Sequence, residues 1–308
     1  MSLLLLAPNR DMQPWKEAVL EVDPNLDVEV WPDVGPKERV QFVVSWDHPN
    51  GVLNRYPNLK AVSSLGAGAD HILRDPELPK SVEICRVVSP SLVRQMQEYV
   101  LGAVLNFQRN SYTYFRRKQE RIWEVLPNKD LHDIPVGIMG LGRLGRPVAE
   151  HLALNGYRVS GWSQSQKNIE GIHCYDGNRL DTFLSESRIL VCHLPLTEAT
   201  EGILELELFK KLQHPSYLIN VGRGEHLVDE DLIYALDKGW FGGACLDVFT
   251  EEPLPGSHPF WNRENIMITP HAASITPPEE VAEQLVENYK RALSGMELLN
   301  QVDREKGY

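Results

Sequence analysis

Three residues whose side chains can combine in acid–base chemistry lie in the last third of the sequence. Arg223, Glu252 and His271 each follow a short apolar run that predicts a buried strand. The carboxyl ends of parallel strands meet at one edge of an open sheet, where ligands bind. An arginine can hold a carboxylate through paired hydrogen bonds, and a carboxylate beside a histidine favours the imidazolium, which donates a proton. The combination suits reduction of a 2-oxo acid. As alternatives, Arg223 by itself could cap a turn and Glu252 by itself could form an ion pair on the surface.

A glycine-rich turn lies upstream of these three residues. Residues 140–145 match the pattern GxGxxG through Gly140, Gly142 and Gly145, between a run typical of a buried strand and a segment typical of a helix. With 22 glycines in the chain, chance alone gives this spacing with a probability of roughly 10%, so the context matters. In that context the glycines let backbone N–H groups approach a diphosphate. The turn predicts dinucleotide binding, and the alternative is a purely structural turn.

The segment about 20 residues beyond such a turn contacts the ribose of the dinucleotide. An acidic residue there accepts a hydrogen bond from the 2′-hydroxyl of NAD, whereas hydrogen-bond donors suit the 2′-phosphate of NADP. Residues 159–167 contain neither an acid nor an arginine. They contain Ser163, Gln164, Ser165 and Lys167, which can all donate to a phosphate. The segment therefore favours NADP over NAD.

The chain has ten histidines, and most must be structural or exposed, because only one or two can act as general acids. His193, which ends an apolar run, is an example of a histidine for which we expect no catalytic role. The combination of Arg223, Glu252 and His271 behind a nucleotide-binding motif favours a catalytic role for those three residues.

Short apolar runs alternate with longer mixed segments in two series along the chain. Such runs between helical segments are typical of parallel sheets covered on both faces. Helical spacing predicts a long helix within Ser91–Trp123, between the two series, and a C-terminal helix within Thr276–Gln301. The expected strands are Leu3–Ala7, Val28–Trp31, Phe42–Trp46, Ala61–Leu65 and Ile84–Val88, then Val136–Gly140, Arg158–Trp162, Ile189–His193, Tyr217–Val221, Ala244–Phe249 and Ile266–Thr269.

Length and charge limit the classes of function. The chain of 308 residues is 42% hydrophobic and 24% charged, which is ordinary globular composition and long enough for two domains. Asp and Glu total 43 against 31 Lys and Arg, a net charge of −12. Because an acidic surface repels phosphate backbones and anionic lipids, we expect no nucleic-acid or membrane partner.

Cysteine spacing and the first residues bear on the compartment. None of Cys85, Cys174, Cys192 and Cys245 forms a CxxC pair, which favours reduced thiols in a cytoplasmic protein. The run at residues 2–8 is too short for the hydrophobic region of a signal peptide and lacks basic residues before it. It predicts a first buried strand.

Taken together, these residues resemble the D-2-hydroxyacid dehydrogenase family. Residues 95–99 and 301–308 resemble the bacterial glyoxylate/hydroxypyruvate reductase A subgroup. That subgroup usually has basic residues in its Trp-Ser-Arg stretch and prefers NADPH, whereas Gln164 and Gln166 stand there in this sequence. The family resemblance is carried, in the family's order, by residues 65–70, the glycine turn from Gly140, and residues 192–200, 220–229 and 247–271.

The resemblance implies a fold and a division of the chain. The family has two doubly wound α/β parallel-sheet domains, a flavodoxin-like substrate domain and a Rossmann cofactor domain. Here residues 1–95 with 275–308 would bind substrate, and residues 96–274 would bind the dinucleotide. The long helix between the domains usually builds a homodimer in this family.

The resemblance also implies roles for single residues. Arg223, Glu252 and His271 match the family's catalytic triad. Ala67 and Gly68 match the loop whose backbone N–H groups hold the substrate carboxylate, with Arg223 as a further substrate contact. Trp46 is similar to a residue that walls the substrate pocket, and the alternative is a core aromatic residue. Asp247 matches the residue that holds the nicotinamide carboxamide. The other implied cofactor-binding positions are Gly140, Gly142, Arg143, Leu144, Gly145, Ser163, Gln164, Ser165, Lys167, Leu194, Pro195, Thr200 and Val221.

The implied activity is NADPH-dependent reduction of glyoxylate to glycolate and of hydroxypyruvate to glycerate, with NAD as a possible second cofactor. In this mechanism Arg223 orients the carboxylate and carbonyl, and His271, paired with Glu252, donates the proton. One alternative is an NAD-linked relative, such as a phosphoglycerate or formate dehydrogenase. Another is a dinucleotide-sensing corepressor or binding protein without turnover.

Overall fold

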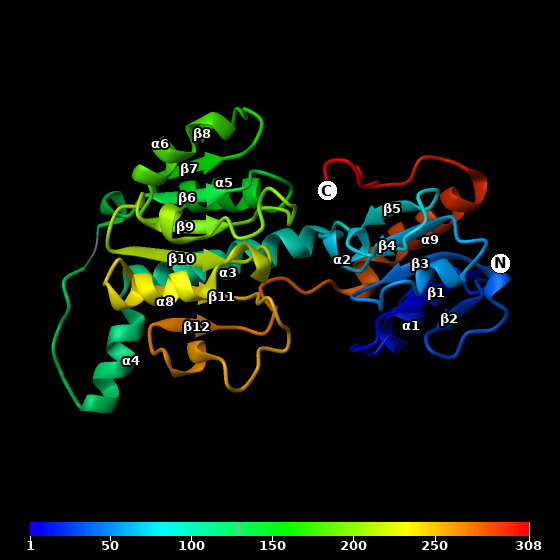
Figure 1. Ribbon diagram of the computed structural model, residues 1–308, viewed down its shortest axis with the longest axis horizontal. Helices are drawn as coiled ribbons and strands as arrows, with labels where there is room; N and C mark the ends of the chain where they lie inside the picture. Colours follow the sequence, from blue (N-terminus) through cyan, green and yellow to red (C-terminus); the bar gives the residue numbers. More distant parts are fainter. Residues whose placement is uncertain (129, 308) are drawn as a thin grey trace. The chain divides into compact units, whose positions relative to one another are not determined.

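The computed structural model describes residues 1–128 and 130–307, so that Lys129 and Tyr308 lie outside the described residues (Figure 1). The chain divides into two compact units. Unit 1 comprises Met1–Leu92 and Ile275–Tyr308, and unit 2 comprises Val93–Ser274. The C-terminal part of the chain therefore returns to the unit that the N-terminal part began.

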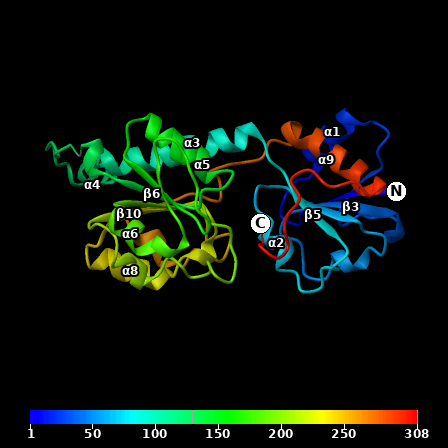
Figure 2. The same cartoon turned by 90° about the horizontal axis from the view of Figure 1, so that it is seen from above.

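Unit 1 is built on a five-stranded parallel sheet in the order β2-β1-β3-β4-β5. The strands read as apolar runs because helices and loops bury both faces of the sheet. The C-terminal helix α9 (Pro278–Ser294) packs against α1 (Gln13–Val22) on one face, as Figure 2 shows. The strands are β1 (Ser2–Leu6), β2 (Val28–Val30), β3 (Val40–Ser45), β4 (Ala61–Ser64) and β5 (Glu83–Arg86), and α2 spans Asp70–Leu73.

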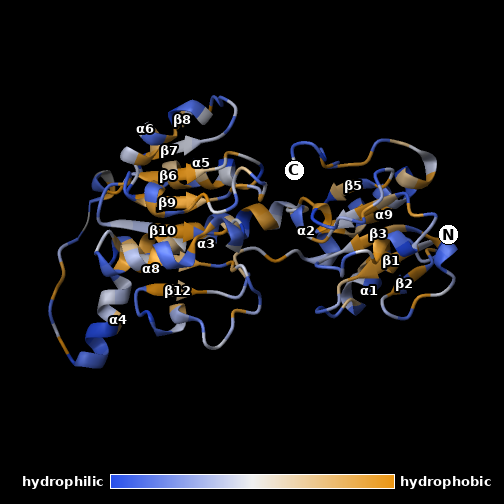
Figure 3. Cartoon of the chain, in the orientation of Figure 1, coloured by the Kyte–Doolittle hydropathy of each residue, from blue (hydrophilic) through white to orange (hydrophobic). Residues whose placement is uncertain are grey.

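Unit 2 is built on a seven-stranded parallel sheet in the order β12-β11-β10-β9-β6-β7-β8. Buried side chains cover both faces, and Figure 3 shows the hydrophobic strands within each unit. The strand order reverses between β6 and β9, which is the crevice at which doubly wound sheets bind nucleotides. The strands are β6 (Val136–Met139), β7 (Val159–Trp162), β8 (His173–Tyr175), β9 (Ile189–Cys192), β10 (Ser216–Asn220), β11 (Phe241–Leu246) and β12 (Ile266–Ile268).

The helices of unit 2 connect these strands. Helix α5 begins directly at the glycine turn after β6, and helix α8 follows the loop after β10. The α-helices are α3 (Pro90–Gln108, which starts within unit 1), α4 (Ser111–Glu120), α5 (Gly145–Leu154), α6 (Leu180–Ser185), α7 (Leu206–Phe209) and α8 (Asp229–Asp237).

The predicted fold class, two doubly wound parallel-sheet domains, is confirmed. Every strand predicted from an apolar run is present, within one to three residues at each end. Strand β8 was missed because it has three residues at the edge of the sheet and starts at the exposed His173. The described helices include none that is long and apolar enough to cross a membrane.

The segment Ser91–Trp123 contains the predicted long helix as α3, but a second helix follows it where the prediction had one helix. Helix α3 ends at Gln108 and α4 starts at Ser111, with Asn110 between them in the left-handed conformation at φ 56°. Asparagine tolerates this conformation better than most residues, and its side-chain amide donates to the carbonyl of Pro127. The apolar positions that predict the helix end at Phe107, and no proline between Ser91 and Trp123 marks the break.

Candidate active site

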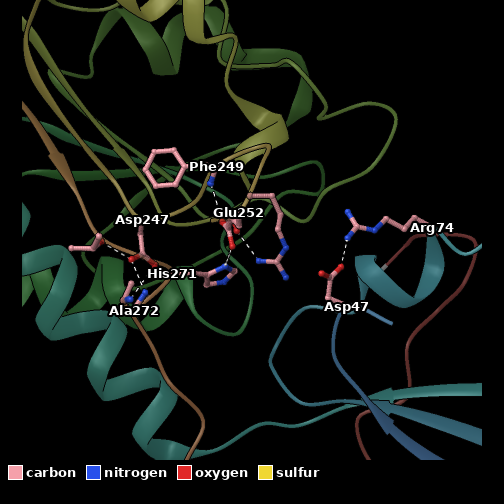
Figure 4. Close-up of polar contacts among 11 residues, drawn as sticks. Asp47, Arg74, Asp247, Phe249, Glu252, His271 and Ala272 are labelled. Carbon is pink, nitrogen blue, oxygen red and sulfur yellow. Dashed lines mark hydrogen bonds and ion pairs between the residues drawn. The ribbon is translucent and has the colours of Figure 1, made fainter. Parts of the chain in front are cut away.

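Arg223, Glu252 and His271 follow three strands that are neighbours in the sheet of unit 2. Arg223 lies after β10, Glu252 after β11 and His271 after β12. All three strands are parallel, so these residues lie at the same carboxyl edge. Figure 4 shows Glu252 and His271 next to each other, and the charge of Arg223 acts on Glu252. The structure thus brings together the three residues that the sequence singled out.

The imidazole of His271 is hydrogen-bonded to the carboxylate of Glu252. His271 Nδ1 lies 2.8 Å from Glu252 Oε2, and the backbone N–H of Phe249 donates to Glu252 Oε1 at 2.9 Å. Burial alone would raise the pKa of Glu252, but the hydrogen bond and charge of His271, the Phe249 N–H and the charge of Arg223 together lower it. The carboxylate therefore stays ionised next to the imidazole.

The loop that carries His271 is held by the buried side chain of Asp247. His271 has a φ of 53°, a conformation that non-glycine residues adopt only when their surroundings impose it. Asp247 Oδ1 accepts from the Ala272 N–H at 2.8 Å, and Asp247 Oδ2 accepts from the Ala273 N–H at 3.0 Å. The hydroxyl of Thr269 also donates to Oδ1. Asp247, which is predicted to hold the nicotinamide carboxamide, therefore also fixes the backbone that follows His271.

The loop of Arg223 is tightly packed against the loop of Glu252. A Cβ added at Gly224 would lie 1.8 Å from the backbone carbon of Phe249, so only glycine fits there. The Arg223 Nη1 donates to the Gly222 carbonyl at 2.7 Å. Because the charge of Arg223 also lowers the pKa of Glu252, arginine, carboxylate and imidazole form one electrostatic unit.

The glycine turn after β6 forms a cradle that fits a dinucleotide. A Cβ added at Gly140, which has a φ of 97°, would lie 2.7 Å from the His193 carbonyl oxygen. A Cβ added at Gly145 would lie 1.9 Å from the Gly140 carbonyl oxygen, so both glycines are needed for the turn itself. At Gly142 an added Cβ would meet no described atom within 4 Å. The backbone there is open to a ligand, as a diphosphate site requires.

The loop after β7 exposes the predicted phosphate donors. Gln164, Ser165 and Lys167 are exposed, whereas Ser163 is buried and its hydroxyl donates to the Ser165 carbonyl at 2.8 Å. The structure adds Arg179, which sequence reasoning missed because it lies beyond β8. Arg179 Nη2 donates to Gln166 Oε1 at 3.1 Å, and its guanidinium lies over the ring of Tyr175. The loop itself contains no arginine, but the guanidinium of Arg179 lies beside it. The Asp176 carboxylate is 3.6 Å from Arg179 Nε.

The remaining predicted cofactor-lining residues surround the ends of β9 and β10. Leu194 and Val221 are each 7% exposed, and the Thr200 hydroxyl donates to the Pro195 carbonyl at 2.7 Å. Arg143 is exposed, and Leu144 precedes α5. Burial lowers the pKa of His193 to about 4, so this imidazole is neutral near pH 7 and unsuited to proton donation. The interpretation of His193 as noncatalytic agrees with this shift.

In unit 1, the predicted substrate residues lie at the carboxyl edge of the sheet. A Cβ added at Gly66 would lie 2.8 Å from the ring of Trp46, so the indole lies against the start of the predicted carboxylate loop. The Trp46 ring also contacts the ring of His71, with centroids 4.6 Å apart, and the guanidinium of Arg10, 4.5 Å from its centroid.

Side chains fix the backbone of the same loop. The Ser64 hydroxyl donates to the Gly68 carbonyl at 2.6 Å, and Arg86 Nη1 donates to the Ala67 carbonyl at 3.1 Å. The loop that follows Trp46 is joined to α2 by the ion pair of Asp47 and Arg74, which Figure 4 also draws.

Comparison with known proteins shows the family to which this chain belongs. The model of the family described as "D-isomer specific 2-hydroxyacid dehydrogenase, NAD binding domain" matches residues 101–273. The proteins named glyoxylate/hydroxypyruvate reductase A of Photorhabdus laumondii and Escherichia fergusonii are each 38% identical to this chain, and the alignments cover all of both chains. The chain belongs to the D-isomer specific 2-hydroxyacid dehydrogenase family. The resemblance found in the sequence, to the family and to its reductase A subgroup, is confirmed.

Solved structures of relatives share the whole fold. A D-isomer specific 2-hydroxyacid dehydrogenase from Xanthobacter autotrophicus, in complex with NADPH and MES, has a TM-score of 0.94 at 38% identity and covers 100% of this chain and 99% of its own. A glyoxylate/hydroxypyruvate reductase from Sinorhizobium meliloti, in complex with NADP and sulfate, has a TM-score of 0.92 at 35% identity with both chains fully covered. As a member of this family, the chain is an NAD(P)-dependent 2-hydroxyacid dehydrogenase.

The open backbone at Gly142 generates a first prediction. Gly142→Ala should leave thermal stability nearly unchanged, because the added methyl group meets no described atom, but should weaken dinucleotide binding by roughly 10-fold or more, the scale of a one-carbon misfit. Titration with NADPH and with NADH, followed by fluorescence, measures this. Gly102→Ala in α3, where an added Cβ also meets nothing, is the matched control and should bind normally. Unchanged binding by Gly142→Ala would place the diphosphate elsewhere.

Proposed function

We propose that this protein reduces small 2-oxo acids with NADPH, converting glyoxylate to glycolate and hydroxypyruvate to glycerate. The observation that carries the proposal is the His271–Glu252 pair beside Arg223, at the edge of a sheet that also presents a dinucleotide cradle. The names of the full-length relatives support the substrate class. The NADPH and NADP complexes of two structural relatives support the cofactor.

In this proposal each of the three residues has one task. Arg223 binds the substrate carboxylate and the carbonyl oxygen, which polarises the carbonyl carbon. His271 donates the proton to the carbonyl oxygen from Nε2, because its Nδ1 is engaged by Glu252. Glu252 pairs with Nδ1 of the imidazole and fixes the orientation of the ring. A bound nicotinamide supplies the hydride that completes the reduction.

The loop after β7 supports NADPH as the preferred cofactor. Its exposed side chains at residues 164, 165 and 167 are donors without a carboxylate among them. Arg179 adds the guanidinium that the loop itself lacks, oriented by Gln166. Arginine beside this position suits a 2′-phosphate, whereas an acid would suit the 2′-hydroxyl of NAD.

We further propose that the backbone of Ala67 and Gly68 and the ring of Trp46 bind the substrate. The indole occupies the space next to Gly66, so a large group on C3 of the acid would meet a rigid wall. This favours C2 and C3 acids over branched or aromatic ones.

The remaining proposals concern assembly and compartment. We propose a homodimer that uses the segment following α3, where the exposed Phe115, Trp123 and Val125 have fractional exposures of 67%, 100% and 93%.

We propose that the protein is cytoplasmic, because its four buried free cysteines suit a reducing compartment.

Replacement of His271 tests the proton donor. His271→Asn should lower turnover of glyoxylate by roughly 10²–10⁴-fold, because the general acid is lost while the loop is kept. Steady-state kinetics measure this, and NADPH titration should show cofactor binding largely intact. His214→Asn, at an exposed histidine before β10, is the control and should keep full turnover. Turnover near the wild-type value in His271→Asn would remove this residue from the mechanism.

Cofactor choice can be tested at two positions. The unmodified protein should have a higher kcat/KM with NADPH than with NADH, and Gln164→Asp should shift this ratio toward NADH by repelling the 2′-phosphate. Arg179→Ala should lower kcat/KM for NADPH and leave that for NADH nearly unchanged, so NADH serves as the internal control. Equal or better efficiency of the unmodified protein with NADH contradicts the assignment.

Substrate size tests the role of Trp46. Glyoxylate and hydroxypyruvate should be reduced best, with roughly 10–200-fold lower kcat/KM for each step toward bulkier 2-oxo acids. Trp46→Ala should flatten this ranking, as a panel of 2-oxo acids will measure. If the unmodified protein prefers phenylpyruvate to glyoxylate, both the proposed role of Trp46 and the proposed substrate class are wrong.

A further inference from the structure

The peptide of Arg223 is held by side chains that no part of the proposed mechanism uses. Asn220, the last residue of β10, is fully buried, and its Nδ2 donates to the Arg223 carbonyl at 2.9 Å. The backbone N–H of Arg223 donates to His226 Nδ1 at 3.0 Å. Both backbone polar groups of this arginine therefore have side-chain partners, which fixes the direction in which its side chain leaves the loop.

His226 is fully buried and bridges two loops of unit 2. Its Nδ1 accepts from Arg223, so its proton lies on Nε2, which donates to the Pro195 carbonyl at 3.3 Å. Pro195 lies in the loop after β9, which is predicted to line the cofactor. One imidazole in one tautomer thus joins the peptide of the substrate-binding arginine to that loop.

The sequence around His226 is adapted to this bridge. A Cβ added at Gly222 would lie 3.0 Å from His226 Nδ1 and Cε1, so the imidazole lies against a position where a side chain would crowd it. The backbone of His226 is also fixed, because its carbonyl accepts from the Leu204 N–H at 2.8 Å. The Pro195 carbonyl has a second donor, the Thr200 hydroxyl, so the cofactor loop stays anchored without His226.

We propose that His226 is a positioning residue for the reaction: it holds Arg223 in register with the cofactor loop and so sets both substrate affinity and turnover. The proposal rests on the role of Arg223 in the proposed function. Loss of the imidazole would leave a buried N–H of Arg223 without its acceptor, which costs enough to displace the peptide. A displaced guanidinium holds the 2-oxo acid less well before and during the reaction.

Three replacements of His226 separate its two hydrogen bonds. In His226→Asn, Oδ1 takes the place of Nδ1 and can accept from Arg223, but the shorter side chain does not reach Pro195. His226→Gln can extend a donor toward Pro195 without placing an acceptor at the Nδ1 position. His226→Ala removes both bonds.

In steady-state kinetics with glyoxylate and NADPH, kcat/KM should decrease in the order wild type, His226→Asn, His226→Gln and His226→Ala. We expect kcat/KM to fall roughly 10–100-fold in His226→Ala, with kcat lowered and KM for glyoxylate raised. His226→Asn should recover most of this loss. NADPH affinity, measured by fluorescence titration, should change by less than about 3-fold because Thr200 still anchors Pro195. A merely structural role would lower the fraction of active protein, and hence kcat, with KM unchanged in all three variants.

A double-mutant cycle tests whether His226 acts through Arg223. In an Arg223→Lys background the planar guanidinium is already lost, so adding His226→Ala should lower kcat/KM by much less than it does in the wild type. Independent, multiplicative losses would overturn the proposal, as would Asn and Gln variants of equal activity. If His226→Ala does not fold, the kcat/KM values of His226→Asn and His226→Gln still test the proposal, which requires the Asn variant to be the more active of the two.

Failure of the proposed function can be distinguished from failure of the positioning role of His226. Normal glyoxylate reduction by Arg223→Lys would remove the arginine from the mechanism. A strong effect of Arg223→Lys together with unaltered His226 variants would reject the positioning role alone.

Discussion

The chemistry assigned to this protein depends on the hydrogen bond between His271 Nδ1 and Glu252 Oε2, 2.8 Å long. A carboxylate that accepts from one ring nitrogen of a histidine fixes the tautomer and the direction of the ring. The pKa of Glu252 is lowered despite the burial that would raise it, because His271, the Phe249 N–H and Arg223 all favour its charge. The pair therefore keeps a charged carboxylate at Nδ1, which fixes the direction of the imidazole ring.

The fold supplies the rigidity that such a pair needs. Neighbouring strands of one parallel sheet fix the three loops that bear Arg223, Glu252 and His271. Each loop is then held by a second contact within unit 2. Asp247 binds the backbone after His271, Gly224 allows the arginine loop to pack on Phe249, and His226 accepts from the Arg223 peptide. Buried polar groups with all partners in place hold geometry better than surface contacts do.

Much of this arrangement was predictable from the sequence. Buried parallel strands need continuous apolar runs, so the runs revealed both sheets and the residues at their carboxyl ends. The glycine spacing revealed the turn, since Gly140 and Gly145 cannot carry a side chain there. The break at Asn110 was not predictable, because no proline marks it and the contact of Asn110 with Pro127 is distant in sequence. The roles of Arg179 and His226 were not predictable either. Their roles come from partners in other loops, and neither lies in a motif that local spacing reveals.

The central claim is that an ionised Glu252 holds His271 for proton donation, and the pH dependence of glyoxylate reduction tests it most directly. Because the pKa of Glu252 is lowered, kcat/KM of the unmodified protein should hold as pH falls and should decline only below the usual range of a carboxylic acid. Glu252→Gln keeps an oxygen that can accept from His271 Nδ1 but has no carboxyl group to titrate, so its kcat/KM should be lower near neutral pH and should lack this decline in acid. An acid decline that Glu252→Gln leaves unchanged would contradict the account.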